Sequence, residues 1–150
     1  MSELFEIHKE QFRISTNKEK LDLHAIADML SRAYWSRGRT LAQLERALDR
    51  SLVFGLFDEN RQIGLARVIS DFSIFAYLCD VIIHEDYRGR GLGIWLVQNV
   101  MAYPELQGLR RWILATRDAH GLYRKFGWND LEHPEFMMEI FSPNPGEDPG

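Results

Sequence analysis

The sequence predicts an α/β fold in which helices cover both faces of a mixed β-sheet. Amphipathic helical patterns and short β-type runs follow one another along the chain. The run over residues 75–83 is almost wholly apolar apart from Asp80, which is typical of a central strand covered on both faces. A predicted helix separates this strand from the next one, at residues 111–115, and such a crossover makes the two strands parallel.

The first fifty residues predict one strand and two helices. Apolar Phe12 and Ile14 alternate with polar residues over 11–15, as in a strand. The first helix is indicated by apolar residues at helical spacing, namely Leu23, Ile26, Ala27 and Leu30. Thr40 and Gln43 form a capping-box signal for the second helix. The apolar stripe of that helix consists of Leu41, Leu44 and Leu48.

The rest of the chain consists mostly of predicted strands. Two β-type runs flank a turn at residues 58–60 and predict an antiparallel hairpin. In chain order the elements are strands over 52–57, 63–69 and 75–83, a helix over 91–102, a strand over 111–115, a helix over 119–126 and a last strand over 137–141. We expect residues 1–141 to form one domain. Residues 142–150 hold three prolines and two glycines and are predicted to be a disordered tail.

Composition and charge limit the classes of function. With 45% hydrophobic and 27% charged residues, the 150-residue chain can form an ordinary globular core. Its net charge of −4 does not favour a nucleic-acid partner. The single Cys79, the lack of a signal-peptide pattern and the lack of an apolar run of about 20 residues predict a cytoplasmic protein with no membrane partner. The histidines and Cys79 show no metal-ligand spacing, so no metal site is predicted.

A glycine-rich turn lies where the central strand gives way to a helix. It consists of Arg88, Gly89, Arg90, Gly91, Leu92 and Gly93. Glycines permit positive φ angles and let backbone N–H groups approach a ligand closely. The first N–H groups of a helix are unpaired and carry partial positive charge, and the two arginines add charged donors. The turn is therefore a candidate phosphate site.

Two known phosphate-binding motifs do not match the residues of this turn, and a third, ligand-free interpretation stays open. A P-loop requires Gly-Lys-Ser/Thr, but here Gly93 is followed by Ile94 and Trp95. A dinucleotide fingerprint requires its third glycine at position 94, which is isoleucine. The third interpretation is a tight strand-to-helix turn with solvated arginines and no ligand, and these residues alone leave it open.

Two motifs together resemble the GNAT superfamily of acyl-CoA-dependent N-acetyltransferases. Residues 88–93 match its Arg/Gln-x-x-Gly-x-Gly/Ala signature after a central strand. Residues 119–128, one helix and one strand later, resemble the family's Leu-Tyr helix with its Gly-aromatic exit, and Tyr123 is the tyrosine of that motif. Thr116 stands seven residues before it, where the family often has asparagine, and Glu85 stands where the family often has proline.

The resemblance implies a more specific fold and a cofactor. The sheet should have six to seven strands, mostly antiparallel, with a splay between the central strand and the strand after it, and about four flanking helices. The diphosphate of acetyl-CoA should lie on residues 88–93, with the pantetheine arm along the strand that ends at Ile83. A backbone N–H near Ile82 would hold the acetyl carbonyl. Thr116 would contact the cofactor, and Tyr123 would lie beside the thioester sulfur.

Acetyl transfer to an amine requires a neutral amine, a fixed donor for the tetrahedral oxyanion and a proton for the departing thiolate. By resemblance, Tyr123 is the candidate general acid; without the motif it is an aromatic residue of the core. Asp80 is a carboxylate in an apolar strand, where an unpaired charge is costly. It either faces the acceptor, to bind its ammonium or accept its proton through water, or forms a structural ion pair, for instance with Arg67.

The loop after the first predicted helix carries two adjacent aromatic residues, Tyr34 and Trp35. In the family this loop lines the acceptor pocket, and aromatic walls suit an apolar or cationic acceptor. The alternative is a hydrophobic plug under the loop. Arg37 and Arg39 either bind an acceptor carboxylate or are simply solvated. His120, on the same predicted helix as the candidate acid, is a further base candidate.

With the resemblance, these residues predict transfer of an acetyl group from acetyl-CoA to a primary amine of a small molecule, by direct attack in a ternary complex. The predicted catalytic residues are Tyr123 and Asp80, and the predicted acceptor-binding residues are Tyr34, Trp35 and Asp80. Two alternatives stay open: a non-catalytic module that binds or senses acyl-CoA, and a protein or peptide N-acetyltransferase. The chain is expected to be a monomer or a homodimer.

Overall fold

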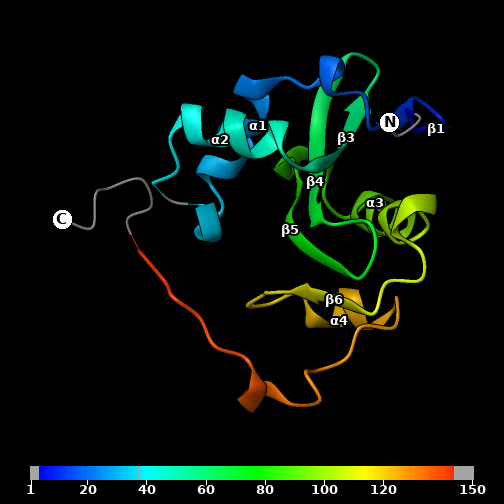
Figure 1. Ribbon diagram of the computed structural model, residues 1–150. Coiled ribbons are helices and arrows are strands. Elements are labelled where there is room, and N and C mark those ends of the chain that lie inside the picture. The colour runs from blue at the N-terminus through cyan, green and yellow to red at the C-terminus, as the bar shows by residue number, and fades with distance from the viewer. Residues whose placement is uncertain (1–3, 37, 144–150) are drawn as a thin grey trace.

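A computed structural model describes residues 4–36 and 38–143, which form a six-stranded sheet flanked by helices (Figure 1). The strands lie in chain order, with β1 at one edge and β6 at the other. Their bounds are β1 Glu6–Lys9, β2 Phe12–Ser15, β3 Leu52–Asp58, β4 Arg61–Ser70, β5 Phe75–Ile83 and β6 Arg111–Leu114. Neighbouring strands are antiparallel except for β5 and β6, which are parallel. The predicted fold class is confirmed.

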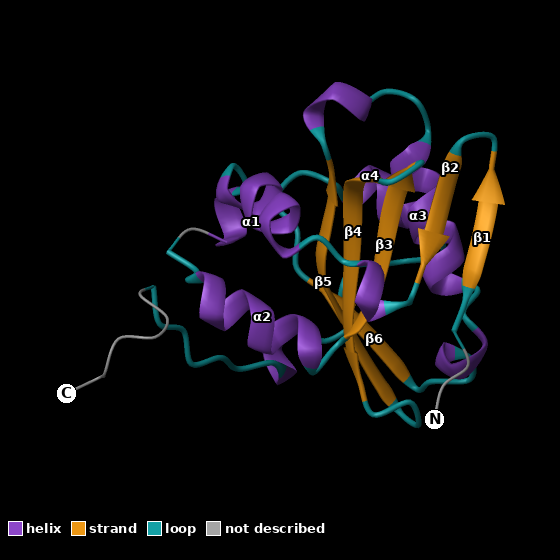
Figure 2. Ribbon diagram, turned by 90° about the horizontal axis from the view of Figure 1, so that it is seen from above, coloured by secondary structure: helices purple, strands orange, loops and turns teal. Residues whose placement is uncertain are grey.

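Two helices lie on each face of the sheet (Figure 2). The first face carries α1 Leu23–Ser31 and α2 Leu41–Asp49, and the second carries α3 Leu92–Met101 and α4 His120–Arg124. Short 3-10 helices occupy Lys18–Lys20, Tyr34–Ser36, Glu85–Tyr87, Pro104–Leu106 and Pro134–Phe136. None of the helices in the described part of the chain is long and apolar enough to cross a membrane.

The helices begin in two different ways. Asp22 caps α1 by accepting a hydrogen bond from the N–H of Ala25 at 3.0 Å. Thr40 and Gln43 form both halves of the predicted capping box at α2. By contrast, the N-cap residue of α3 is Gly91, which has a left-handed backbone and no side chain to cap the helix. The first N–H groups of α3 are therefore left to a ligand or to solvent.

Each face of the sheet has its own apolar cluster. The cluster under α1 and α2 contains Ile26, Met29, Leu30, Ala33, Leu44, Leu48, Val53, Leu65 and Ile82. The larger cluster under α3 and α4 includes Phe54, Leu56, Val68, Leu78, Leu96, Val97, Val100 and Tyr123. Most apolar positions that defined the first two helical patterns are buried or partly buried, although Leu41 is exposed. Burial of these stripes fixes the helix layers against the sheet.

A β-bulge at Cys79 reorients the second half of β5. Arg67 of β4 pairs with Asp80, whereas its neighbour Val68 pairs with Leu78, so Cys79 is an extra residue. Simple alternation would place Leu78 and Asp80 on the same face of the sheet. Because of the bulge, Leu78 packs in the cluster under α3 and α4, whereas Asp80 points to the opposite face, toward the connection between α1 and α2.

The strands β5 and β6 pair along only part of their length. Their register runs from Phe75 opposite Arg111 to Leu78 opposite Leu114. Residues 79–83 of β5 have no strand beside them on this side within the described residues. The expected splay is therefore present, and it leaves one backbone edge of β5 open next to the start of α3.

The prediction was wrong for two elements. It missed β1, where Ile7 is the one apolar residue among four. The predicted last strand over 137–141 is not a strand; the residues follow the 3-10 helix Pro134–Phe136 as an exposed irregular segment. This segment is apolar enough for a strand, but no described strand of the same chain pairs with it. Of the predicted tail, residues 144–150 lie outside the described residues.

Candidate active site

The glycine-rich turn has the open geometry that its sequence predicts. Gly89 and Gly91 both have a φ angle of +79°. Apart from its chain neighbours, a Cβ atom added at either position would have no atom within 4 Å. The backbone is therefore accessible at the N-terminus of α3, whose 10 residues direct their peptide dipoles toward this point. A phosphate group can lie on these N–H groups.

The two arginines of the turn are exposed. Arg88 donates from Nε to the carbonyl oxygen of Ile83 at 3.1 Å, which holds its guanidinium beside the open edge of β5. The guanidinium of Arg90 lies 5.1 Å from the ring centroid of Tyr87. Neither arginine pairs with a carboxylate of residues 4–36 or 38–143, so both charges are available to an anion.

The register of β5 identifies the N–H groups along its open edge. The N–H of His84 donates to the carbonyl of Ile63 at 2.7 Å, so alternate residues, including Ile82, direct their N–H groups toward β4. Val81 and Ile83 direct theirs to the side that lacks a strand. Of the residues next to Ile82, Val81 and Ile83 are therefore the ones whose N–H groups lie on the open edge.

Asp80 is 1% exposed and accepts hydrogen bonds on both carboxylate oxygens. Its Oδ1 accepts from the indole Nε1 of Trp35 at 2.7 Å. Its Oδ2 accepts from Nε of Arg67 at 2.7 Å and from Nη1 of Arg39 at 3.1 Å. The ion pair with Arg67, which was one of the two sequence-based alternatives, is thus present, and it is extended by Trp35 and Arg39.

The surroundings of Asp80 determine its charge. Burial alone would raise the pKa of Asp80, but the positive charges and hydrogen bonds of Arg67 and Arg39 outweigh burial and lower it. The carboxylate is therefore ionised near neutral pH and is a weak proton acceptor. Two guanidinium groups, those of Arg67 and Arg39, face this single carboxylate. The surroundings of Asp80 therefore carry an excess of positive charge.

A cleft of about 710 Å³ brings the predicted residues together. Its lining includes Tyr34, Trp35, Asp80, Thr116, Arg117 and Tyr123. The hydroxyl of Tyr34 accepts a hydrogen bond from the backbone N–H of Arg117 at 2.9 Å, and the guanidinium of Arg117 lies 3.8 Å from the centroid of the Tyr34 ring. The cleft is therefore closed on one side by a contact between the α1–α2 connection and the loop after β6.

Tyr123 lines this cleft from α4 and is 8% exposed. Its hydroxyl has no hydrogen-bond partner among the described residues. Burial, with a smaller contribution from Tyr34, raises the pKa of Tyr123 to about 12. The side chain is therefore a neutral phenol at neutral pH, with its proton available to a group in the cleft.

The remaining predicted residues differ in their relation to the cleft. Thr116 lines it and accepts a hydrogen bond on Oγ1 from the N–H of Ala119 at 3.1 Å, which fixes the turn into α4. His120 is exposed and lines a neighbouring groove of about 390 Å³ instead. Arg37 lies outside the described residues. The site thus gathers Tyr34, Trp35, Arg39, Asp80, Thr116 and Tyr123, and leaves out His120.

One cleft residue, Arg117, was not a candidate in the sequence. It lies in the exposed loop between β6 and α4, within the polar run Thr116-Arg117-Asp118. Its partner Tyr34 is 83 positions away in the chain. A single arginine in a polar loop forms no motif, so only the folded arrangement identifies it.

Known proteins match this chain both in sequence and in fold. The profile of the acetyltransferase (GNAT) family matches residues 2–128. A GNAT-family protein of known structure from Xanthomonas campestris is 45% identical, with a TM-score of 0.86, over 89% of this chain and 95% of that one. A structure from Deinococcus radiodurans, 20% identical over 89% of this chain and 90% of that one, has a TM-score of 0.71 and shares the fold.

A relative known from its sequence is an uncharacterized N-acetyltransferase, ycf52-like, from Prochlorococcus marinus. It is 35% identical over 114 residues, which are 72% of this chain and 63% of that protein. The chain therefore spans less than two thirds of that relative's length. The uncharacterized N-acetyltransferase ycf52 of Gracilaria tenuistipitata is 34% identical over 129 residues, 81% of this chain and 68% of that protein.

Proposed function

The chain belongs to the acetyltransferase (GNAT) family, and we propose that it transfers an acetyl group from acetyl-CoA to a primary amine of a small molecule. One observation carries this proposal. The open edge of β5 runs from the glycine-rich turn at residues 88–93 to the cleft that contains Tyr123. A donor with phosphates at one end and a thioester at the other fits this arrangement.

Each part of the donor is matched by a group of the chain. The N–H groups at the start of α3, with Arg88 and Arg90, suit the diphosphate. The N–H of Val81 or Ile83 would hold the acetyl carbonyl and stabilise the tetrahedral oxyanion, and loss of one such donor costs about 3 kcal/mol in other enzymes. Tyr123, as a neutral phenol, would protonate the departing thiolate.

The acceptor end of the cleft carries more positive than negative charge. Its charged side chains are Arg39, Arg67, Asp80, Arg117 and Asp118. Asp80 is already bound by two arginines, so it has little capacity left for a substrate ammonium. We therefore favour an acceptor whose amine is accompanied by an anionic group such as a carboxylate, with Tyr34 and Trp35 as the walls of its site.

The acceptor class can be tested by release of free CoA thiol from acetyl-CoA across a panel of amines. We expect amino acids and short peptides with a free amine and carboxylate to have kcat/KM values at least about tenfold higher than polyamines of similar length, because like charges in a binding site cost affinity. Enzyme without acetyl-CoA is the blank, since Cys79 also carries a free thiol.

Other outcomes of the panel would point elsewhere. Faster reaction of polyamines would contradict the charge argument and restore Asp80 as the ammonium site. Activity confined to peptides would indicate a peptide N-acetyltransferase. If no amine releases thiol while the protein still binds CoA in calorimetry, then catalysis is excluded for these acceptors and a non-catalytic acyl-CoA-binding module is favoured.

The donor site can be tested by a Gly91→Ala substitution. Because a non-glycine residue with positive φ is strained, we expect the free energy of unfolding to fall by about 1–2 kcal/mol. The added methyl group also projects into the open space above the turn, so CoA affinity in calorimetry should fall roughly tenfold.

Gly108→Ala is the matched control for this prediction. Gly108 has a φ angle of +73° and equally open surroundings, but it lies in the loop before β6. We expect it to lose similar stability in urea denaturation and to bind CoA normally. Equal CoA affinity in both variants would contradict the assignment of the turn.

A further inference from the structure

The charged side chains of the 710 Å³ cleft are not equally available to a ligand. Arg67 donates from Nε to Asp80 and from Nη1 to the hydroxyl of Ser51 at 3.0 Å, and its side chain is only 11% exposed. Arg39 donates to the same carboxylate, and its side chain is 22% exposed. These two arginines are therefore committed to the buried network around Asp80.

Arg117 is the arginine of this cleft whose charge the protein does not bind. Its side chain is exposed, and none of its guanidinium N–H groups donates to an atom of residues 4–36 or 38–143. The next residue, Asp118, also lines the cleft, but it forms no ion pair with Arg117. The positive charge that is available to a ligand in the cleft therefore resides on Arg117.

The backbone of Arg117 is held in place, whereas its side chain rests on an aromatic ring. The backbone N–H donates to the hydroxyl of Tyr34 at 2.9 Å, and the guanidinium carbon lies over the ring of the same tyrosine, 3.8 Å from its centroid. A cation–π contact that is open to solvent is weak, and it leaves the N–H groups of the guanidinium free to donate. The side chain can therefore pair with an anion while the backbone contact stays intact.

We infer that Arg117 determines acceptor specificity by pairing its guanidinium with a carboxylate of the acceptor molecule. This inference rests on the proposed function, in which an amine in the same cleft is acetylated. The planar fork of an arginine matches a carboxylate through two parallel hydrogen bonds. One unbound cation balances the single charge of a carboxylate, whereas a phosphate monoester with two charges would need a second cation.

The burial of the cleft residues gives the bound acceptor a direction. Tyr123 and Arg117 both line the cleft, but the tyrosine is only 8% exposed, whereas the arginine is exposed in the loop between β6 and α4. The candidate acid is therefore at the deeper end, and the free cation is at the mouth. An acceptor bound in this way enters with its amine first and keeps its carboxylate at the mouth of the cleft.

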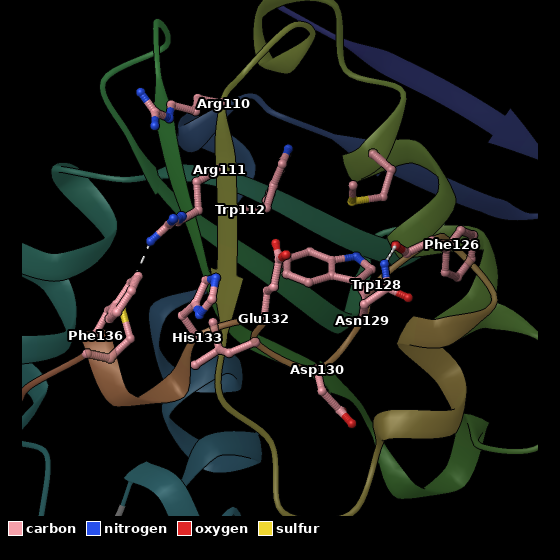
Figure 3. A pocket seen from close by; sticks show the side chains of 14 residues that line it. Arg110, Arg111, Trp112, Phe126, Trp128, Asn129, Asp130, Glu132, His133 and Phe136 are labelled. Carbon is pink, nitrogen blue, oxygen red and sulfur yellow. Dashed lines mark hydrogen bonds between the residues drawn. The ribbon is translucent and has the colours of Figure 1, made fainter.

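A second groove shows that arginines alone do not make such a site. The groove in Figure 3, of about 430 Å³, is lined by Arg110 and Arg111 but also by Asp130 and Glu132. A carboxylate in this groove would meet charges of both signs. Among the described residues, this groove and the cleft have no lining residue in common. Arg110 is therefore a suitable control position for the cleft.

Calorimetry with two product analogues, N-acetylphenylalanine and N-acetylphenylalaninamide, tests this role of Arg117. The two molecules differ only in the carboxylate, and neither carries an amine that titrates. We expect wild type to bind the acid at least about tenfold more tightly than the amide, because hydrogen bonds between charged groups are strong. Arg117→Gln should reduce this preference to less than about twofold. Arg117→Lys should retain part of it, since lysine keeps the charge but lacks the planar fork.

Arg110→Gln removes the same charge outside the cleft and should keep the full preference for the acid. The inference is overturned if wild type binds the amide as tightly as the acid, if Arg117→Gln keeps the preference, or if neither analogue binds. Thiol release from acetyl-CoA tests the proposed function separately. Thiol release with amines but no preference for the acid would retain that function and exclude the role of Arg117. Arg117-dependent binding of the acid without thiol release would do the opposite.

Discussion

A Tyr123→Phe variant is expected to lose about 100-fold in kcat while binding acetyl-CoA as wild type does. Proton transfer by a positioned side chain typically contributes that much or more. The substitution removes one oxygen atom from a residue that is 8% exposed and whose hydroxyl has no protein partner among the described residues. Folding should therefore be little affected, and the loss should appear in turnover.

The pH dependence of the rate follows from the protonation state of Tyr123. The pKa of Tyr123 is raised from 10 to about 12, so the phenol stays protonated at every pH below that value. Between pH 6 and 9 it cannot produce a falling limb in kcat/KM. The rate should rise with pH as the acceptor amine loses its proton. Tyr123→Phe should lower this profile without moving it along the pH axis.

Tyr77→Phe is the matched control, since Tyr77 lines the same cleft from β5 but is more exposed. We expect its kcat to stay within about threefold of wild type, as for most surface substitutions. Initial rates of thiol release at saturating acetyl-CoA measure both variants. A Tyr123→Phe enzyme with normal turnover would exclude the tyrosine as the acid and point to water as the proton donor.

The sequence predicts most of the fold because each of these elements carries its own local signal. The capping box at Thr40, the apolar stripe of α1 and the mostly apolar run of β5 each arise from neighbours in the chain. The strand β1 was missed because it is a polar edge strand, with Ile7 as its one apolar residue. Residues 137–141 have the pattern of a strand, but a strand also needs a partner, and the local sequence does not specify one.

The residues of the candidate site also differ in whether the local sequence predicts their positions. Gly89 and Gly91 could be predicted because their positive φ angles depend on residue type. The partners of Asp80 could not, because Trp35 and Arg39 are 45 and 41 positions away from it. The bulge at Cys79, which points the carboxylate toward them, leaves no mark in the local apolar pattern. Motifs therefore identify the donor end of the site, whereas the acceptor end depends on tertiary contacts.

Asp80→Asn is expected to lower the free energy of unfolding by about 3 kcal/mol, because removal of one partner from a buried ion pair leaves the others uncompensated. Arg67 and Arg39 have side chains only 11% and 22% exposed, so water cannot fully replace the lost carboxylate. The value of kcat/KM should fall as well, since Trp35 and Arg39 lose the group that holds them in the cleft. Urea denaturation and thiol-release rates measure the two effects.

The pH dependence of this loss of stability follows from the direction in which the fold shifts the pKa of Asp80. The folded-state pKa of Asp80 lies below its ordinary value of 3.8, so the carboxylate stabilises the fold fully above that value and loses this effect as the pH falls through the folded-state pKa. The difference between wild type and Asp80→Asn should therefore be constant from pH 5 to pH 8. It should shrink in the acid range below about 3.8.

Two comparisons separate this network from an ordinary surface pair. Asp28→Asn breaks an exposed ion pair, at 2.9 Å, with Arg32 at the C-terminal end of α1, and should cost no more than about 1 kcal/mol. In the double variant with Arg67→Met, the loss should be smaller than the sum of the two single losses, because each single change removes the same interaction. Additive losses would show that Asp80 and Arg67 act independently. If the Asp80→Asn enzyme is destabilised but keeps a wild-type kcat/KM, then Asp80 has a structural role only. Acceptor binding would then depend on Tyr34, Trp35 and Arg117.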